Sequence, residues 1–315
     1  MKKFLLLLLF FLNIVSLYGR EKVIFIPGWY TEWINYSRHR KVLEELFPGA
    51  ELEVFKWDSN RMWENAKFSA EAAVNELCVH LENSTDRSEI TLIGHSLGGR
   101  IVMECAVALV KKNCRIKQAI LLGTAGNIDA EKLDALQKFS IREVINICCF
   151  NDNMLKLYIS KEKSLPLGFS GISHPAANFR QFRMEIPDGD VKIGKVTVMP
   201  GEAMKPLRET IAHLALYYLK TLKMALNGEL TPYCLNYPEL ERIAAQDSVK
   251  PDKLPGFKEV SSFDNWILEK RKWKGSCRII APSGRKFYYS DAKIAQDNFS
   301  KITGILKAAR SHAVK

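Results

Sequence analysis

The chain has 315 residues, and 46 Lys and Arg against 35 Asp and Glu give it a formal net charge of +11 at pH 7. This length allows one large hydrophobic core together with a small second unit. The basic residues are spread along the chain without a basic-aromatic motif, so the composition does not indicate a nucleic-acid-binding protein. No spacing of Cys and His residues indicates a zinc site.

The first nineteen residues have the pattern of a secretory signal sequence. Lys2 and Lys3 precede an apolar run from Phe4 to Leu12, and cleavage would follow Gly19. An uncleaved N-terminal anchor is the alternative, because Leu17 is larger than the small residue preferred near a cleavage site. We therefore expect a secreted or periplasmic protein.

Downstream of the signal, apolar runs typical of buried strands alternate with helical patterns. Strands are predicted at 22–26, 51–57, 90–93, 116–122, 143–150 and 179–186. Helices are predicted at 33–47, 62–81, 101–110, 130–139 and 213–222, with a helical turn at 155–160 and a hairpin at 191–198. This alternation indicates a mainly parallel sheet that helices cover on both faces.

The central motif of the chain is Gly94-His-Ser-Leu-Gly98, which lies between a predicted strand and a predicted helix. Strand, G-x-S-x-G and helix are typical of a nucleophile elbow, in which a tight turn exposes the hydroxyl of Ser96 above the sheet. A Cβ at Gly94 or Gly98 would collide with a neighbouring strand or helix. We therefore predict that Ser96 is a nucleophile; a chance match in a glycine-rich turn is the alternative.

A serine nucleophile requires a histidine base and a carboxylate that orients this histidine. In this type of sheet the acid and then the histidine follow the serine along the chain. Asp152 comes directly after the predicted strand 143–150 and is the predicted acid, although a turn or helix-cap role would also place Asp there. Asp129, which looks more like a helix N-cap, is the alternative. His213 is the predicted base and His174 the alternative.

The negative oxygen that forms during acyl transfer requires two backbone N–H donors. One is expected from Leu97, the residue after the nucleophile. The other is expected from Trp29, or else Tyr30, in the turn after the first strand, where Gly28 gives the backbone freedom.

Together these residues resemble the α/β-hydrolase superfamily. The matching residues are Ile26-Pro-Gly-Trp29, Gly94 to Gly98, Asp152 and His213, within roughly residues 21–225. The resemblance implies a three-layer, mainly parallel sheet and an esterase- or lipase-like serine hydrolase with a Ser-His-Asp triad and no metal or organic cofactor. The usual His-Gly after the first strand is Pro27-Gly28 here. Segments 144–155, 168–172 and 213–217 are also similar to a poorly characterised hydrolase branch related to transmembrane and coiled-coil proteins.

The predicted organisation is a signal peptide at 1–19, an α/β-hydrolase domain at 20–226 and a small α+β extension of unknown role at 227–315. The extension is rich in Pro and charged residues, and a hairpin at 277–289 and a helix at 292–309 are predicted in it. Only about twenty residues separate the strands 116–122 and 143–150, so no large cap insertion is expected.

The expected substrate is a small-molecule or lipid ester, and no nucleic acid or partner protein is expected. A thioesterase or amidase would use the same triad, and a non-catalytic binding protein on a hydrolase scaffold is the remaining alternative. Peripheral contact with a membrane stays open. Residues 165–169 and the aromatic residues Trp29, Tyr30 and Trp33 are candidates for lining an acyl pocket, with core packing as the alternative.

The seven cysteines show no metal-ligand spacing. Most of them, including Cys78, Cys105 and the pair Cys148-Cys149, lie in apolar segments and are predicted to be core thiols. Cys234 and Cys277 both lie in the extension and could form a disulfide in an oxidising compartment.

Overall fold

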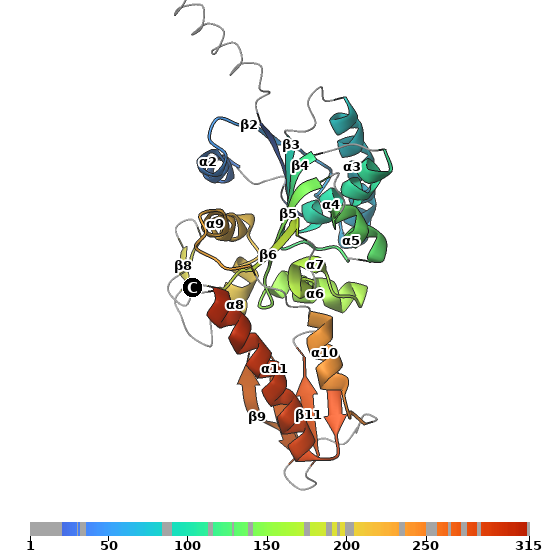
Figure 1. The fold of residues 1–315 in the computed structure, drawn as a ribbon, viewed down its shortest axis with the longest axis vertical. Helices are drawn as coiled ribbons and strands as arrows, with labels where there is room; N and C mark the ends of the chain where they lie inside the picture. The colour runs from blue at the N-terminus through green and yellow to red at the C-terminus, as the bar shows by residue number, and fades with distance from the viewer. Residues whose placement is uncertain are drawn as a thin grey trace, which may run out of the picture.

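In the computed structural model, the chain folds around a six-stranded sheet with a smaller unit beside it (Figure 1). The structure describes residues 21–29, 31, 36–83, 90–112, 116–127, 129–137, 141–172, 177–186, 191–193, 196–198, 205–232, 237–249, 257–263, 266–271, 276–281 and 285–313. The strands of the sheet are β1 (Lys22–Ile26), β2 (Glu51–Val54), β3 (Ile90–His95), β4 (Ile116–Leu122), β5 (Ile141–Cys148) and β6 (Phe179–Arg183). They are hydrogen-bonded in the order β2-β1-β3-β4-β5-β6, and every neighbouring pair is parallel.

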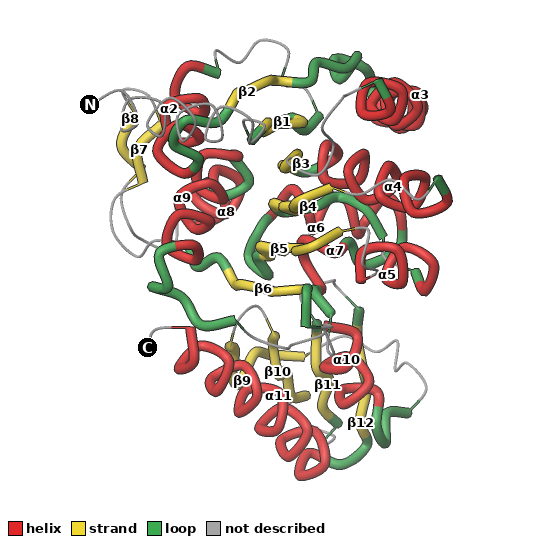
Figure 2. The backbone as a smooth tube through the Cα atoms, turned by 45° about the horizontal axis from the view of Figure 1, so that its top comes forward, coloured by secondary structure: helices red, strands yellow, loops and turns green. Residues whose placement is uncertain are grey.

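Helices cover both faces of this sheet. They are α2 (Ser37–Leu46), α3 (Trp63–Glu82), α4 (Leu97–Lys111), α5 (Ala130–Gln137), α6 (Asn153–Glu162), α7 (Leu167–Ser170), α8 (Lys205–Ile211) and α9 (Ala215–Leu226). Figure 2 shows α3, α4 and α5 on one face, and α2, α8 and α9 on the other. The predicted three-layer architecture of the α/β-hydrolase type is confirmed. Among the described residues between β4 and β5, α5 is the only helix, so this connection carries no large cap.

Successive residues of the central strands enter two different cores, which explains the continuous apolar runs in the sequence. In β1, Ile24 and Ile26 pack with α3 and α4, while Val23 and Phe25 pack with α2 and α9. All four side chains are fully buried. A strand that is buried on both faces has no solvent-facing positions, so it loses the polar alternation of a half-exposed strand.

The order of the strands creates a crevice beside β1 and β3. The chain runs from β1 outward to β2 and then returns to the other side of β1 as β3, so the loops after β1 and β3 diverge. Pro27-Gly28 follows β1, and Ser96 follows β3. A Cβ on Gly28 would lie only 2.8 Å from the Cβ of Ser96, so the two loops begin side by side before they diverge.

One predicted helical turn is in fact a complete helix. The sequence predicts a turn at 155–160, but α6 extends over ten residues. The side chain of Asp152 caps its N-terminus, and Lys163 ends it in a left-handed conformation with φ 55°. These caps satisfy backbone groups at both ends, and the short apolar pattern alone does not reveal them.

Several other predicted boundaries differ from the structure, including the strand predicted at 51–57, which ends at Val54. The helix predicted at 33–47 begins at Ser37 in the structure, with residues 32–35 outside the described part. The strand predicted at 179–186 ends at Arg183. His213 was expected at the start of a helix, but it lies in the turn between α8 and α9, with its N–H bonded to the Thr210 carbonyl oxygen at 3.2 Å.

The C-terminal unit is an antiparallel sheet with helices, and it confirms the predicted α+β extension. Its elements are α10 (Tyr237–Ala245), β9 (Phe257–Phe263), β10 (Trp266–Arg271), β11 (Cys277–Ile280), β12 (Lys286–Tyr289) and α11 (Ala292–Ala313). The strands are arranged in the order β12-β11-β10-β9. The sequence predicts β11, β12 and α11 but not β9, β10 and α10. The short hairpin β7 (Val191–Ile193) and β8 (Val196–Val198) was predicted and belongs to neither large sheet.

The extension shares a core with the main domain. Its buried residues Trp266, Tyr289 and Phe299 belong to the same cluster as the residues of α3, α4 and α6. Figure 1 shows the unit, drawn in orange and red, next to α6 and α7. The exact boundary between the two units, after residue 226, stays a prediction.

Residues 1–20 lie outside the described part of the chain, so the signal sequence also stays a prediction. In the part that the structure describes, no helix has the length and apolarity needed to cross a bilayer.

The cysteines predicted to be in the core are buried. Cys78 of α3 and Cys105 of α4 meet between the two helices, with their Sγ atoms 3.0 Å apart. Cys234 lies outside the described residues, so its pairing with Cys277 stays a prediction.

The buried and exposed faces of α3 allow a direct test of how this helix packs against the sheet. Leu77 is fully buried, whereas Phe68 on the same helix is 70% exposed. We expect Leu77→Ala to lower the free energy of unfolding by about 2–5 kcal/mol, because it leaves a cavity in the core. Phe68→Ala should change it by less than about 1 kcal/mol. Urea unfolding followed by circular dichroism would measure both, and equal losses would contradict the burial pattern.

Candidate active site

Ser96 occupies the tight turn between β3 and α4 with a strained backbone. Its φ is 55°, in the left-handed region that non-glycine residues rarely adopt. The Ser96 N–H donates to the Leu122 carbonyl oxygen at 2.9 Å, and the Ser96 carbonyl oxygen accepts from the Ala125 N–H at 2.9 Å. These bonds to β4 and the loop after it hold the residue in a conformation that costs about 1–3 kcal/mol.

The glycines on either side of this turn lie where no side chain fits. A Cβ on Gly94 would be 2.5 Å from the carbonyl oxygen of Gly98, and one on Gly98 would be 2.1 Å from that of Ile26. Both obstacles are backbone atoms, which cannot rotate away. Substitution of either glycine would therefore push α4 away from β1 and β3.

Ser96, His213 and Asp152 form one hydrogen-bonded chain. His213 Nε2 lies 2.9 Å from Ser96 Oγ, and His213 Nδ1 lies 2.6 Å from Asp152 Oδ2. The carboxylate accepts, so the hydrogen belongs on Nδ1, and Nε2 is left to accept the hydroxyl hydrogen of Ser96. This tautomer is the one that a general base requires.

Asp152 is both a partner of His213 and the N-cap of α6. Its Oδ1 accepts from the backbone N–H groups of Met154 at 2.9 Å and Leu155 at 3.1 Å, and its Oδ2 faces His213. The side chain is fully buried. One carboxylate oxygen caps α6 and the other contacts His213, so the cap role does not exclude the predicted acid role.

Tyr218 is a third partner of Asp152 that the sequence does not reveal. Its hydroxyl donates to Asp152 Oδ2 at 2.7 Å from the first turns of α9. Burial, followed by the nearby charge of Asp152, raises the pKa of Tyr218 well above its ordinary value of 10.0. The phenol therefore stays protonated and acts as a donor. Its position beside Tyr217 in an apolar helix gives no sequence signal for this contact.

His95, the residue before the nucleophile, supports the turn that carries His213. The carbonyl oxygen of His213 lies 2.7 Å from His95 Nε2 and can only accept, so Nε2 carries the hydrogen. The two imidazole rings are 4.9 Å apart. Burial, with the neighbouring His213 as the next cause, lowers the pKa of His95 well below 6.5, so this donor stays neutral.

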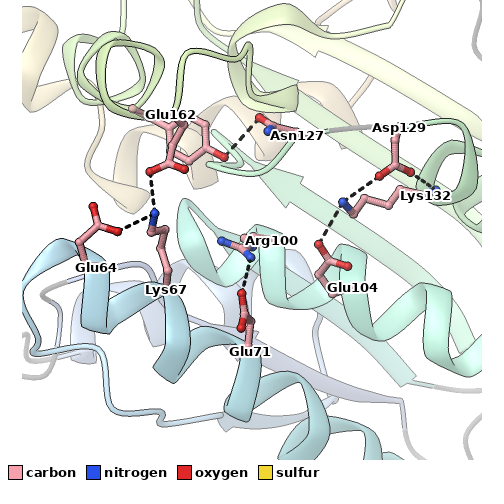
Figure 3. Close-up of polar contacts among 10 residues, drawn as sticks. Glu64, Lys67, Glu71, Arg100, Glu104, Asn127, Asp129, Lys132 and Glu162 are labelled. Carbon is pink, nitrogen blue, oxygen red and sulfur yellow. Dashed lines mark hydrogen bonds and ion pairs between the residues drawn. The ribbon is translucent and has the colours of Figure 1, made fainter.

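The alternative site residues lie elsewhere or outside the described part. Asp129 caps α5 and pairs with Lys132, whose Nζ is 3.0 Å from its Oδ2 (Figure 3). It does not contact the Ser96 site. His174, Tyr30 and Trp33 are not among the described residues.

A pocket of about 430 Å³, counted with its open mouth, lies beside Ser96 and His213. The other lining residues are Trp29, Trp63, Ala125, Met154, Leu155, Leu157, Tyr158 and Lys161. Residues 165–169 do not line it: Leu167 and Phe169 are fully buried in the core. In the described residues, no group of three or more His, Cys, Asp and Glu could hold a metal ion.

Comparison with known families gives one match. The model of DUF726, described as a protein of unknown function, matches residues 55–181, which are less than half of the chain. Among curated proteins the comparison found no match.

Solved structures that the chain resembles include a thioesterase and two proteins described as hydrolases. RedJ, a thioesterase of the prodiginine pathway from Streptomyces coelicolor, is 16% identical with a TM-score of 0.26, over 33% of this chain and 40% of RedJ. A cell-surface hydrolase from Lactobacillus plantarum is 11% identical with a TM-score of 0.33, over 61% of this chain and 90% of the other. A protein described as a hydrolase of the α/β superfamily, from Xanthomonas campestris pv. campestris, is 12% identical with a TM-score of 0.33, over 65% of this chain and 98% of the other. The chain thus spans less than half the length of RedJ. The assignment of the fold rests on the strand order of the present structure.

The Tyr218 contact can be tested by removing one oxygen atom. Tyr218→Phe keeps the ring and leaves the buried Asp152 carboxylate with one donor fewer. We expect the free energy of unfolding to fall by about 1–3 kcal/mol. Chemical denaturation at pH 7 would measure this loss, and unchanged stability would show that the bond contributes nothing.

The lowered pKa of His95 predicts a pH dependence of stability. Below pH 6.5 the unfolded chain binds a proton at His95 that the folded protein excludes. The folded protein therefore loses stability as the pH falls from 6.5 toward the lowered pKa of His95. His95→Gln keeps an N–H donor and removes this titration. The fall in unfolding free energy between pH 6.5 and 5 should then be shallower, by up to about 1.4 kcal/mol per pH unit.

Urea unfolding at several pH values would measure the slope. The slope of His95→Gln is compared with that of His39→Gln, which should also be shallower than the wild-type slope because burial lowers the pKa of His39 as well. A slope in His95→Gln identical to that of the wild type would contradict the assignment.

Proposed function

We propose that the protein is a serine hydrolase that cleaves carboxylic esters through an acyl-enzyme. The observation that carries this proposal is the chain of hydrogen bonds from Asp152 through His213 to Ser96, with the nucleophile held at a φ of 55°. Both bonds have the lengths and the order that a nucleophile, its base and an orienting carboxylate require.

In the proposed reaction, Ser96 Oγ attacks the ester carbonyl carbon while His213 Nε2 takes the hydroxyl proton. The carboxylate of Asp152 stabilises the resulting imidazolium. His213 then gives this proton to the departing alcohol oxygen, and the C–O bond of the ester breaks. Water attacks the acyl-enzyme with His213 again as the base, which releases the acid and restores Ser96.

The oxyanion is proposed to accept hydrogen bonds from the backbone N–H groups of Leu97 and Trp29. Leu97 is the first residue of α4, and the first N–H groups of a helix have no acceptor within the helix. The helix N-terminus adds a favourable partial charge. Trp29 follows Gly28, which approaches Ser96 closely, and it lines the same pocket as the nucleophile.

A fluorophosphonate probe tests this function directly. The probe should label the folded wild type, and Ser96→Ala should abolish labelling. Asp152→Asn and His213→Ala should lower kcat/KM for p-nitrophenyl esters by about 10⁴-fold or more.

Ser300→Ala, at an exposed serine of α11, is the control and should be labelled as the wild type is. A folded wild type that resists the probe, or labelling that persists in Ser96→Ala, would contradict the proposal. A panel of esters, thioesters and amides of one acid then compares the three bond types that this machinery can cleave.

A further inference from the structure

Three aromatic side chains form a continuous wall of the pocket beside Ser96. Trp29 lies in the turn after β1, Trp63 in α3 and Tyr158 in α6. Trp63 packs edge to face against both others, with ring centroids 5.3 Å from Trp29 and 5.8 Å from Tyr158. Trp63 is therefore the central member of the wall.

The polar atoms of these rings are all bonded to other groups. Trp29 Nε1 donates to the Arg61 carbonyl oxygen at 2.8 Å, Trp63 Nε1 to Glu162 Oε1 at 2.8 Å, and the Tyr158 hydroxyl to Asn127 Oδ1 at 3.3 Å. The wall thus offers a substrate apolar ring surface. A polar acyl group placed against it would lose its bonds to water without replacement.

Glu162 fixes the position of Trp63. Its Oε1 accepts from both Trp63 Nε1 at 2.8 Å and Lys67 Nζ at 3.0 Å, and thereby ties the last residue of α6 to α3. Lys67 also pairs with Glu64 at 2.8 Å, so it lies between two carboxylates (Figure 3). Burial raises the pKa of Glu162, but the bonds from Trp63 and Lys67 outweigh it and lower the pKa overall. Glu162 is therefore ionised at neutral pH.

The same helix carries both the wall contact and the acid of the site. α6 begins at its cap, Asp152, and ends at Glu162. Its residues Leu155, Leu157 and Tyr158 face the pocket. The hydrogen bond from Trp63 to Glu162 therefore ties the end of α6 to α3 beside this pocket.

We propose that this pocket binds an apolar acyl group of short or medium length, and that Glu162 is the positioning residue that sets its width through Trp63. The inference rests on the proposed function, because it assigns the acyl side of the same ester. Lys161 also lines the pocket, but its Nζ lies over the Trp63 ring at 5.9 Å from the centroid. A cation there gives the competing prediction of an anionic acyl group.

The test compares p-nitrophenyl acetate, butyrate, hexanoate and octanoate with the hemisuccinate, in wild type and variants. In Glu162→Ala, kcat/KM for whichever of the butyrate, hexanoate and octanoate esters the wild type prefers should fall about 10-fold. One methylene group of a substrate in an apolar pocket changes kcat/KM by about 10–200-fold, and the lost wall contact is of this size. The value for acetate should stay within about 2-fold, because its single methyl group offers the wall little apolar surface.

Two further variants separate positioning from a general structural role. Glu64→Gln removes the other carboxylate at Lys67, at a side chain that is 72% exposed, and should leave the whole profile within about 2-fold. Trp63→Phe keeps an aromatic ring but loses the N–H donor. It should reproduce the Glu162→Ala profile, and the double variant should add no further change.

The outcomes distinguish the two proposals. Absence of Ser96 labelling by a short-chain fluorophosphonate in the wild type would overturn the function itself. If labelling is intact in all variants but Glu162→Ala keeps the wild-type profile, the positioning role is wrong. A wild type that prefers the hemisuccinate over butyrate would overturn the apolar acyl pocket.

Discussion

The buried carboxylate of Asp152 accepts four hydrogen bonds, from two backbone N–H groups of α6, from His213 and from Tyr218. A carboxylate without access to water is tolerated in a protein interior only when such donors replace its hydration. These four bonds join the end of β5, the start of α6, the turn before α9 and α9 itself. The position of His213 above Ser96 depends on this junction, because Asp152 is the one acceptor that contacts Nδ1 in the described part of the chain.

The strand order of the parallel sheet alone places the turns that carry the site next to each other. β1 and β3 are neighbours, while the chain between them passes through β2 and α3, so the turns at Gly28 and Ser96 meet at one edge. The strained backbone of Ser96 is held by bonds to β4. Strain of this kind persists only where the surrounding structure over-determines the conformation.

The sequence predicts well those features that depend on local pattern. The strands β1, β3, β4 and β5 are recognisable because their residues are apolar on both faces, and Ser96 because its turn requires two glycines. Chain order points to Asp152 and His213, and the structure brings both together with Ser96. Tyr218 and Glu162 are not predictable in this way, because their contacts join residues 66 and 99 positions apart through packing alone. β9 is missed because it is mostly exposed or half-buried and carries few apolar residues.

The double role of Asp152 limits how the specificity of the proposed hydrolase can change. The cap of α6 also holds His213, so a substitution that shifts the first turn of α6 disturbs the proposed base as well. The C-terminal half of the helix, with Leu157, Tyr158 and Lys161, lies farther along the chain from this junction. In the proposed hydrolase, evolution or design that alters the accepted acyl group while keeping the reaction rate would therefore act on that half and leave the capped turn unchanged.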